Sequence, residues 1–137
     1  MITNLKHCKL FNISVKKDNR GYLSYLENKK ELPFYIKRIY FLYKIKKNIL
    51  RGDHGHKKLK QIIIAISGKF DVVINDGKKS KKFKLSKCSQ GLYIPNMMWR
   101  KIENFSKNAI CLVLASEKYN KEDYYNDFEK FKYEKYK

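Results

Sequence analysis

Two histidines separated by one glycine, His54 and His56, form the part of this sequence best suited to chemistry. In an extended strand the side chains alternate between faces, so residues two apart point to the same side and both imidazoles can reach one point. Imidazole titrates near neutral pH, which suits a converging pair to metal binding or to proton transfer. Because short motifs also recur by chance, the alternative is a pair of surface residues in a basic turn.

A second candidate lies in the segment from Phe34 to Ile45, which is dense in aromatic and β-branched residues. If this segment is a strand, Arg38 and Tyr40 share one face. An arginine among apolar neighbours is costly unless it is paired or bound to an anion, so Arg38 predicts an anion site. The alternative is an edge-strand arginine whose guanidinium reaches water.

Short strands separated by turns account for most of the chain. We expect strands over residues 10–15, 22–26, 34–45, 61–67, 69–74, 83–85, 92–95, 99–102 and 109–115, the last of them buried on both faces. Tyr124, Phe128 and Phe131 have helical spacing, which predicts a short C-terminal helix with a frayed end. The pattern predicts one all-β domain spanning residues 1–137, a jelly-roll sandwich or barrel with that helix outside.

The composition limits the class of protein. The 137 residues are 43% hydrophobic and 15% aromatic, enough for a real core. The net charge of +19 indicates a nucleic acid, an anionic membrane or an anionic substrate as partner. However, the lysines are spread over the whole length, and we interpret them as a solvated surface. We therefore predict neither a nucleic-acid nor a membrane partner.

The cysteines and the N-terminus predict where the protein works. Cys8, Cys88 and Cys111 are odd in number and lack C-x-x-C spacing, so neither a disulfide framework nor a zinc site is indicated. The first residues lack the apolar core of a signal peptide, and no apolar run approaches the roughly 20 residues of a membrane span. We expect a cytoplasmic protein.

The histidine segment resembles the first motif of the cupins, in which H-x-H is followed by a glutamate and then by a glycine; here these two positions hold Gln61 and Gly68. The second cupin motif, built on proline, glycine, histidine and asparagine, falls on Pro95, Met97, Arg100 and Asn104. In metal cupins the paired histidines, the glutamate and the later histidine hold the ion. Gln61 is a poor ligand and Arg100 is a permanent cation, so we predict no metal and a histidine pair free for acid–base chemistry.

A narrower resemblance covers nearly the whole chain. It is carried most specifically by the Arg-Gly-x-His-x-His-x4-Gln core, and further by 18–21, 36–40, 91–95, Trp99-Arg100, 104–106, 113–116 and Asp123-Tyr124. These runs resemble the nucleotide-sugar 3,4-ketoisomerases, metal-free cupins that act on dTDP-4-keto-6-deoxyglucose. Two positions depart from the family: Gly55 stands where alanine is common, and Arg100 where histidine also occurs.

The resemblance implies an isomerase without a cofactor. It would convert dTDP-4-keto-6-deoxyglucose to a dTDP-3-keto-6-deoxyhexose through an enediol(ate), in the biosynthesis of a 3-amino-3,6-dideoxyhexose for lipopolysaccharide or another surface glycan. His54 and His56 would carry the protons, with Tyr40 as a relay or as a donor to the developing oxyanion. The family also implies a homodimer, often with the N-terminal strand exchanged.

The remaining candidate residues would bind substrate. Arg38 and Arg51 suit the pyrophosphate or the enediolate oxygen, because guanidinium contacts such oxygens bidentately. Gln61 would orient an imidazole or a sugar hydroxyl. Trp99 is a candidate wall for the nucleotide or simply a core residue, and Asp53 either fixes a histidine tautomer or shapes a turn. Arg100 and Asn104 complete the expected substrate-binding set.

Three other functions remain open on the sequence. A basic β-sandwich could bind nucleic acid through its lysines, which predicts strong salt dependence and no need for the histidines. A metal cupin would be purified with stoichiometric metal. A nucleotide-sugar epimerase on a related scaffold would exchange protons at C3 and C5 without moving the ketone.

Overall fold

The computed structural model describes residues 2–28 and 30–137. Strands account for most of its regular structure, and their bounds are β1 Lys9–Asn12, β2 Ser14–Asp18, β3 Gly21–Tyr25, β4 Arg38–Leu42, β5 Arg51–His56, β6 Gln61–Ser67, β7 Phe70–Asn75, β8 Ser80–Leu85, β9 Gln90–Ile94, β10 Trp99–Glu103, β11 Ile110–Ala115 and β12 Tyr124–Tyr125. The helical segments are the 3-10 helices Leu5–His7 and Lys121–Asp123 and the α-helix α1, Phe128–Tyr136.

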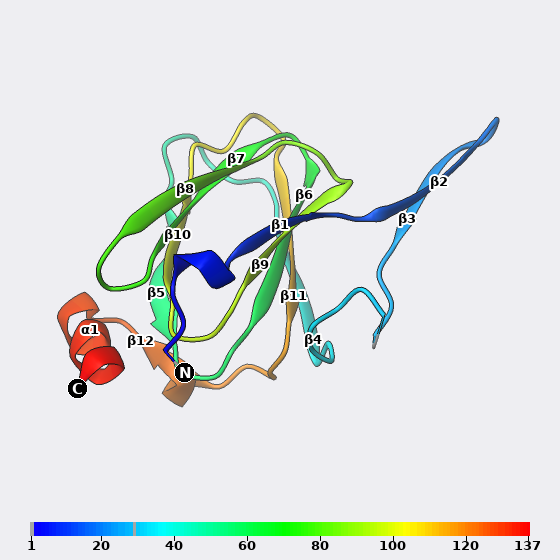
Figure 1. Cartoon of the computed structure of the whole chain (residues 1–137). Coiled ribbons are helices and arrows are strands. Elements are labelled where there is room, and N and C mark those ends of the chain that lie inside the picture. The colour runs from blue at the N-terminus through cyan, green and yellow to red at the C-terminus, as the bar shows by residue number, and fades with distance from the viewer. Residues whose placement is uncertain (1, 29) are drawn as a thin grey trace.

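Two five-stranded antiparallel sheets face each other and form the body of the molecule (Figure 1). The first has the strand order β1-β9-β6-β11-β4, and the second has the order β12-β5-β10-β7-β8. Residues that point inward from both sheets, such as Ile63, Val113, Phe70, Val72 and Leu85, form the core between them. The architecture confirms the predicted all-β jelly-roll class, since antiparallel sheets stacked in this way bury alternate residues of every strand.

The first sheet is also covered on its outer face. Ile62, Ile64 and Leu114 are buried there and pack with Leu32 and with partly buried side chains of the segment leading into β4. As a result β6 and β11 are shielded on both faces over most of their length. This confirms the prediction that the apolar run at 109–115 is a doubly buried strand.

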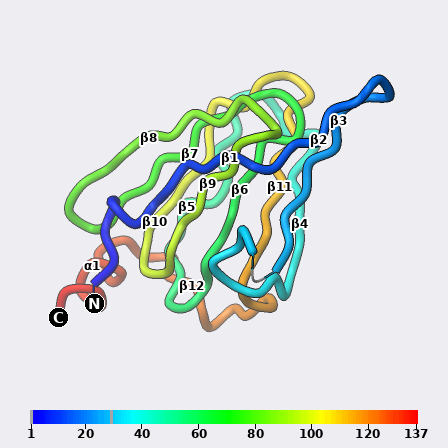
Figure 2. The backbone as a smooth tube through the Cα atoms, turned by 45° about the vertical axis from the view of Figure 1, so that its right-hand side comes forward, coloured from blue at the N-terminus to red at the C-terminus, as the bar shows by residue number. Residues whose placement is uncertain are grey.

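The hairpin of β2 and β3 projects from the body as an arm (Figures 1 and 2). Within the described residues its two strands pair only with each other, from Ser14 opposite Tyr25 to Asp18 opposite Gly21. Most of its residues are exposed. The turn between the strands expected at 10–15 and 22–26 is present at residues 19–20, whereas the extension of the arm away from both sheets was not predicted.

The C-terminal tail differs from the expected helix. The α-helix begins at Phe128, where the Asp127 side chain accepts a hydrogen bond from the Lys130 backbone N–H. Tyr124 lies instead in β12, which pairs with β5, so its helical spacing to Phe128 was misleading. The helix is ordered to Tyr136 rather than frayed, because Phe131 and Lys135 are buried against the body.

The core predicts a specific cost of truncation. Phe70 is 1% exposed and belongs to the central cluster, so Phe70→Ala should lower the free energy of unfolding by about 3–5 kcal/mol through lost burial and a residual cavity. Tyr133→Ala, at a residue 68% exposed on α1, should change it by less than about 0.5 kcal/mol. Urea denaturation followed by circular dichroism measures both, and equal effects of the two substitutions would contradict this account of the core.

Candidate active site

A cavity of about 300 Å³ opens between β4 and β5 and reaches the interior between the sheets. Polar side chains from several strands converge on it, and its lining comprises Arg38, Tyr40, Leu42, Arg51, Gly52, His54, Gln61, Ile63, Arg100, Ile102, Tyr119 and Tyr124. Six residues expected in the site from the sequence, namely Arg38, Tyr40, Arg51, His54, Gln61 and Arg100, lie together in this lining.

Strand β4 contributes one wall of the cavity. Its alternation places Arg38, Tyr40 and Leu42 on the inner face, as the sequence predicted, and leaves Ile39 and Phe41 exposed on the other face. The Arg38 guanidinium lies 5.1 Å from the ring centroid of Tyr40 and 5.7 Å from that of Tyr119. Its Nε atom is buried and has no hydrogen-bond partner among the described residues, so this cation remains available to an anion.

Strand β5 contributes the opposite wall through a β-bulge. Arg100 of β10 lies opposite His54 and Lys101 lies opposite Gly52, so Asp53 is the extra residue on β5. Strict alternation would place Arg51 and His54 on opposite faces of the strand. Because the bulge shifts the alternation by one residue, both side chains line the same cavity.

His54 is neutral and presents one free nitrogen. Its Nδ1–H donates to the Gly52 carbonyl oxygen at 3.0 Å, and a carbonyl can only accept, so the proton of the neutral ring is on Nδ1. Burial and the positive charge of Arg100 lower the pKa of His54 to about 4. At neutral pH its Nε2 is therefore an unprotonated base beside the cavity.

His56 lies behind His54 rather than in the lining. It is 1% exposed, and its ring meets that of His54 edge-on with centroids 4.8 Å apart. Its Nδ1–H donates to a carboxylate oxygen of Asp123 at 3.1 Å, while Nε2 has no partner within the described chain. Burial, with Arg100 as the next cause, strongly lowers the pKa of His56. The two imidazoles do converge, but only His54 borders the space that a substrate could enter.

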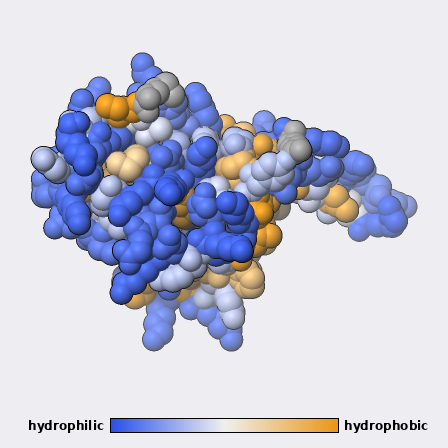
Figure 3. Space-filling view, turned by 90° about the horizontal axis from the view of Figure 1, so that it is seen from below, coloured by the Kyte–Doolittle hydropathy of each residue, from blue (hydrophilic) through white to orange (hydrophobic). Residues whose placement is uncertain are grey.

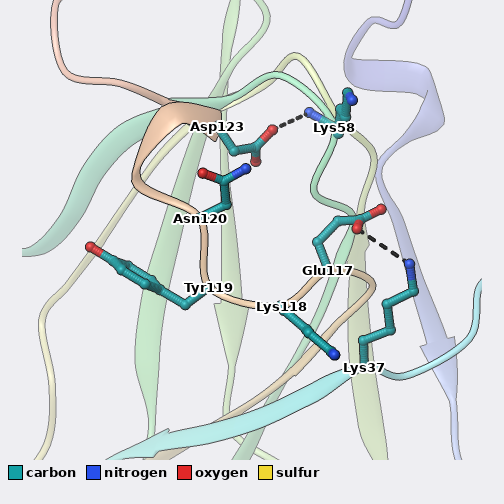
Figure 4. A pocket seen from close by; sticks show the side chains of 7 residues that line it. All are labelled: Lys37, Lys58, Glu117, Lys118, Tyr119, Asn120 and Asp123. Carbon is teal, nitrogen blue, oxygen red and sulfur yellow. Dashed lines mark hydrogen bonds and ion pairs between the residues drawn. The ribbon is translucent and has the colours of Figure 1, made fainter.

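Asp123 and Tyr124, to which sequence reasoning gave no role, complete this side of the site. The Asp123 carboxylate accepts from the backbone N–H of Lys58 at 2.7 Å as well as from His56, and it borders a second hollow of about 570 Å³ (Figure 4). The Tyr124 ring lies 4.8 Å from the centroid of His54 and 4.4 Å from that of His56. Sequence reasoning could have searched for Asp123 on one ground: a buried histidine generally needs a hydrogen-bond acceptor for its ring N–H.

A directional hydrogen-bond chain runs from Arg100 to the cavity. Arg100 is 2% exposed and donates to the Gln61 side-chain oxygen and to the Met98 carbonyl. Since Gln61 accepts through its oxygen, its amide N–H donates to the Tyr40 hydroxyl at 2.9 Å. The Tyr40 oxygen thus accepts from Gln61, and its own proton is free to be donated into the cavity. Burial raises the pKa of Tyr40, so this proton is retained at neutral pH.

Two residues expected to bind substrate lie elsewhere. Trp99 precedes Arg100 in β10 and therefore points to the outer face of the sheet, where it packs against Phe128 and Phe131 of α1. Asn104, at the end of β10, donates its side-chain amide to Asp71. Neither borders the cavity, because Trp99 faces outward and Asn104 lies beyond the strand end.

The donor set does not fit a divalent metal ion. Among residues 2–28 and 30–137, no three His, Cys, Asp or Glu side chains gather as a metal site would require. At the cupin ligand positions Gln61 offers a neutral amide that is already bonded to Arg100, and Arg100 brings a permanent positive charge.

In the described part of the chain no helix is long and apolar enough to cross a membrane.

Comparison with known proteins gives consistent matches. The sequence model of the FdtA family, described as WxcM-like, C-terminal, matches residues 6–136. A TDP-4-oxo-6-deoxy-α-D-glucose-3,4-oxoisomerase of Aneurinibacillus thermoaerophilus is 35% identical over 124 residues, which are 90% of this chain and 89% of that protein.

Two solved structures are similar over almost their whole length. A 3,4-ketoisomerase from Helicobacter canadensis has a TM-score of 0.91 and 44% identity, covering 94% of this chain and 97% of the other. A mutant of the 3,4-ketoisomerase QdtA from Thermoanaerobacterium thermosaccharolyticum, in complex with TDP-4-keto-6-deoxyglucose, has a TM-score of 0.91 and 34% identity, covering 96% of this chain and 95% of the other.

The electrostatics of the site can be measured directly. Because the Arg100 charge disfavours the imidazolium, Arg100→Gln should raise the pKa of His54 from about 4 toward the ordinary value of 6.5. Lys101→Gln, which removes the next cation of β10 outside the cavity lining, should leave it unchanged. NMR titration of the histidine ring protons reads both variants. An unchanged His54 pKa in Arg100→Gln would show that the guanidinium does not govern this base.

Proposed function

The chain belongs to the FdtA family and is an isomerase of the sugar 3,4-ketoisomerase type, and from this we propose that it converts dTDP-4-keto-6-deoxyglucose to a dTDP-3-keto-6-deoxyhexose. The single observation that best supports this reaction is the pairing, across one cavity, of an unprotonated imidazole nitrogen with a protonated phenol. A product of this kind would serve the biosynthesis of a 3-amino-3,6-dideoxyhexose. The cytoplasmic location of the protein remains a prediction.

The proposed reaction begins with proton removal from C3 of the sugar by His54 Nε2. The electron pair left on C3 moves into the C3–C4 bond, and the C4 carbonyl oxygen becomes an enediolate oxygen. Tyr40 donates its hydroxyl proton to that oxygen, supported by the bond from Gln61 and behind it by the Arg100 cation. The His54 imidazolium, which exchanges its proton with solvent at the open cavity, then places a proton on C4, while the C3 hydroxyl gives its proton to the Tyr40 phenolate and becomes the new ketone.

His56 supports this base from behind. It holds its Nδ1–H on Asp123 and packs edge-on against His54, so it limits the orientations open to the His54 ring. Of the two histidines expected to carry protons, we assign the direct transfer to His54 and an orienting role to His56. This division follows from the cavity lining, which includes His54 alone.

The charge of the site suits a nucleotide-linked sugar. Arg38 and Arg51 border the cavity without an acidic partner in its lining, so a pyrophosphate would meet two cations there. The cavity of about 300 Å³ accommodates a hexose more readily than a whole nucleotide sugar, so we expect the nucleotide to lie at its mouth. A nucleotide-sugar epimerase could use the same charges, and only the product distinguishes it.

We further propose that two copies form a homodimer through the arm and the outer face of β4. A two-stranded hairpin is marginally stable in water, and among the described residues β2 and β3 pair with no strand of either sheet. Apolar surface gathers where the arm leaves the body (Figure 3), near a hollow bordered by Ile39 and Ile66, which are 58% and 45% exposed. A second copy that covers this surface would satisfy both the arm and the apolar face.

The assignment of the base predicts the behaviour of three variants. His54→Asn should lower the isomerisation rate by about 10³-fold with nucleotide binding retained, because the general base is lost. His56→Asn should lower it less. His7→Asn is the matched control, since His7 lies in the N-terminal 3-10 helix and should leave the rate unchanged.

Product NMR after incubation with dTDP-4-keto-6-deoxyglucose in deuterated water, with calorimetry of dTDP binding, measures these effects. A ketone at C3 with deuterium at C4 is the expected product. Deuterium at C3 and C5 with the ketone still at C4 would establish an epimerase instead, and full turnover by His54→Asn would remove this residue from the mechanism.

The dimer has its own test. Light scattering of the purified protein should give twice the 16.5 kDa of the chain, about 33 kDa. Ile39→Lys should produce monomers, because it places a charge in the apolar contact, whereas Tyr133→Lys on the exposed side of α1 should remain dimeric. A monomeric wild-type protein would refute the proposal.

A further inference from the structure

Trp99 and Asp53 form a hydrogen bond on the face of the second sheet opposite to the cavity. The Trp99 indole N–H donates to an Asp53 carboxylate oxygen at 3.0 Å. Both residues border a hollow of about 480 Å³ on that outer face, and neither lines the proposed active site. Neither Trp99 nor Asp53 has a role in the proposed proton transfers.

Asp53 nevertheless determines the local geometry of β5. It is the extra residue of the bulge, and it follows Gly52; the two have φ angles of 59° and 83°. Few residues other than glycine adopt the left-handed region; aspartate and asparagine do so when their short polar side chain is hydrogen-bonded, and the Asp53 carboxylate has such a bond. The bond from Trp99 is the side-chain hydrogen bond that the structure gives to Asp53.

The same bulge determines where the Gly52 carbonyl points. That oxygen accepts the hydrogen bond from His54 Nδ1–H, which fixes the ring tautomer and leaves Nε2 as the base. Gly52 is also pressed against the neighbouring strand, because a Cβ placed there would lie 3.3 Å from the Arg100 carbonyl oxygen. The peptide between Gly52 and Asp53 joins the anchored side chain to the carbonyl that orients His54, so a rotation at one disturbs the other.

We propose that Trp99 and Asp53 are positioning residues, whose hydrogen bond on the outer face holds the bulge so that the Gly52 carbonyl keeps His54 in its Nδ1–H tautomer. The proposal deepens the proposed isomerase function and rests on it for its catalytic consequence. Trp99 is in turn fixed by α1, where Phe128 and Phe131 contact the indole at centroid distances of 5.3 and 5.8 Å. The C-terminal helix thereby supports the catalytic base through the outer face of the sheet.

The substitutions that test this separate the hydrogen bond from the charge and from the packing. Trp99→Phe removes the N–H and keeps an aromatic ring against α1. Asp53→Asn removes the charge but keeps an oxygen that can accept from the indole, and asparagine tolerates the left-handed region. Asn126→Ala is the matched control, because Asn126 borders the same outer hollow.

The first readout is ¹⁵N NMR of histidine-labelled protein without substrate, which reports the tautomer of His54 whether or not the chain is an isomerase. Wild type, Asp53→Asn and Asn126→Ala should show the Nδ1–H form, and Trp99→Phe should show a mixture with the Nε2–H form. The second readout is steady-state kinetics. Trp99→Phe should lower kcat about three- to tenfold with KM changed less than twofold, and the other two variants should stay within twofold of wild type.

Several results would overturn the proposal. A wild-type tautomer spectrum in folded Trp99→Phe would show that the indole bond does not hold the carbonyl. Loss of the Nδ1–H form in Asp53→Asn, to the extent seen in Trp99→Phe, would assign the effect to the carboxylate charge rather than to the hydrogen bond. A lower thermal midpoint in Trp99→Phe without a change of tautomer would reduce Trp99 to a structural residue.

Discussion

The site depends on a guanidinium buried without a carboxylate partner. Arg100 is 2% exposed, and among the described residues its guanidinium donates to two neutral oxygens, those of Gln61 and Met98, while its Nε has no partner. An ion taken out of water is costly unless its donors are satisfied, so these acceptors must be held in place, and the Gln61 amide is fixed in one orientation. That orientation aims its N–H at Tyr40 and frees the phenol proton for the cavity. The same positive charge contributes to keeping both imidazoles neutral. In the proposed mechanism a single buried cation therefore acts on both the acid, Tyr40, and the base, His54.

The second constraint is geometric and belongs to β5. A regular strand cannot aim Arg51 and His54 at one cavity, since their positions differ by an odd number of residues. The bulge at Asp53 shifts the alternation so that both side chains reach the cavity. The bulge also lies next to His54, whose ring is oriented by its hydrogen bond to the Gly52 carbonyl. Tyr40 and Arg38 need no such device, because they differ by two positions on the regular strand β4. The two walls of the cavity are thus built by different means, one by plain alternation and one by a local departure from it.

These two constraints also explain what the sequence could predict. Alternation placed Arg38 beside Tyr40 and His54 beside His56, and continuous apolar character identified β11 as doubly buried, because each of these is a local property of one strand. The hydrogen-bond partner of His56 is not local: Asp123 reaches His56 because Tyr124 and Tyr125 pair with β5, and the helical spacing of Tyr124 to Phe128 concealed that strand. Trp99 was considered either a wall for the nucleotide or a core residue; it follows the alternation of β10 to the face opposite Arg100, where it packs against α1. Asn104 was transferred from a motif whose metal this chain does not accommodate.

Keeping His54 neutral makes it a weaker base, and the size of this loss can be compared with the gain from a hydrogen-bond donor at the oxyanion. Burial and Arg100 lower the pKa of His54 from 6.5 to about 4, and a weaker base removes a carbon-bound proton more slowly, here by a factor on the order of ten. A donor aimed at a developing oxyanion in a site of low polarity contributes roughly 10²–10³ in rate. Arg100 adds to the effect of burial in lowering the pKa of His54, and it opposes the rise that burial causes in the pKa of Tyr40. In the proposed mechanism the expected gain at the oxygen therefore exceeds the loss at the nitrogen. The proposed mechanism thus relies on stabilising the enediolate rather than on raising the basicity of the histidine.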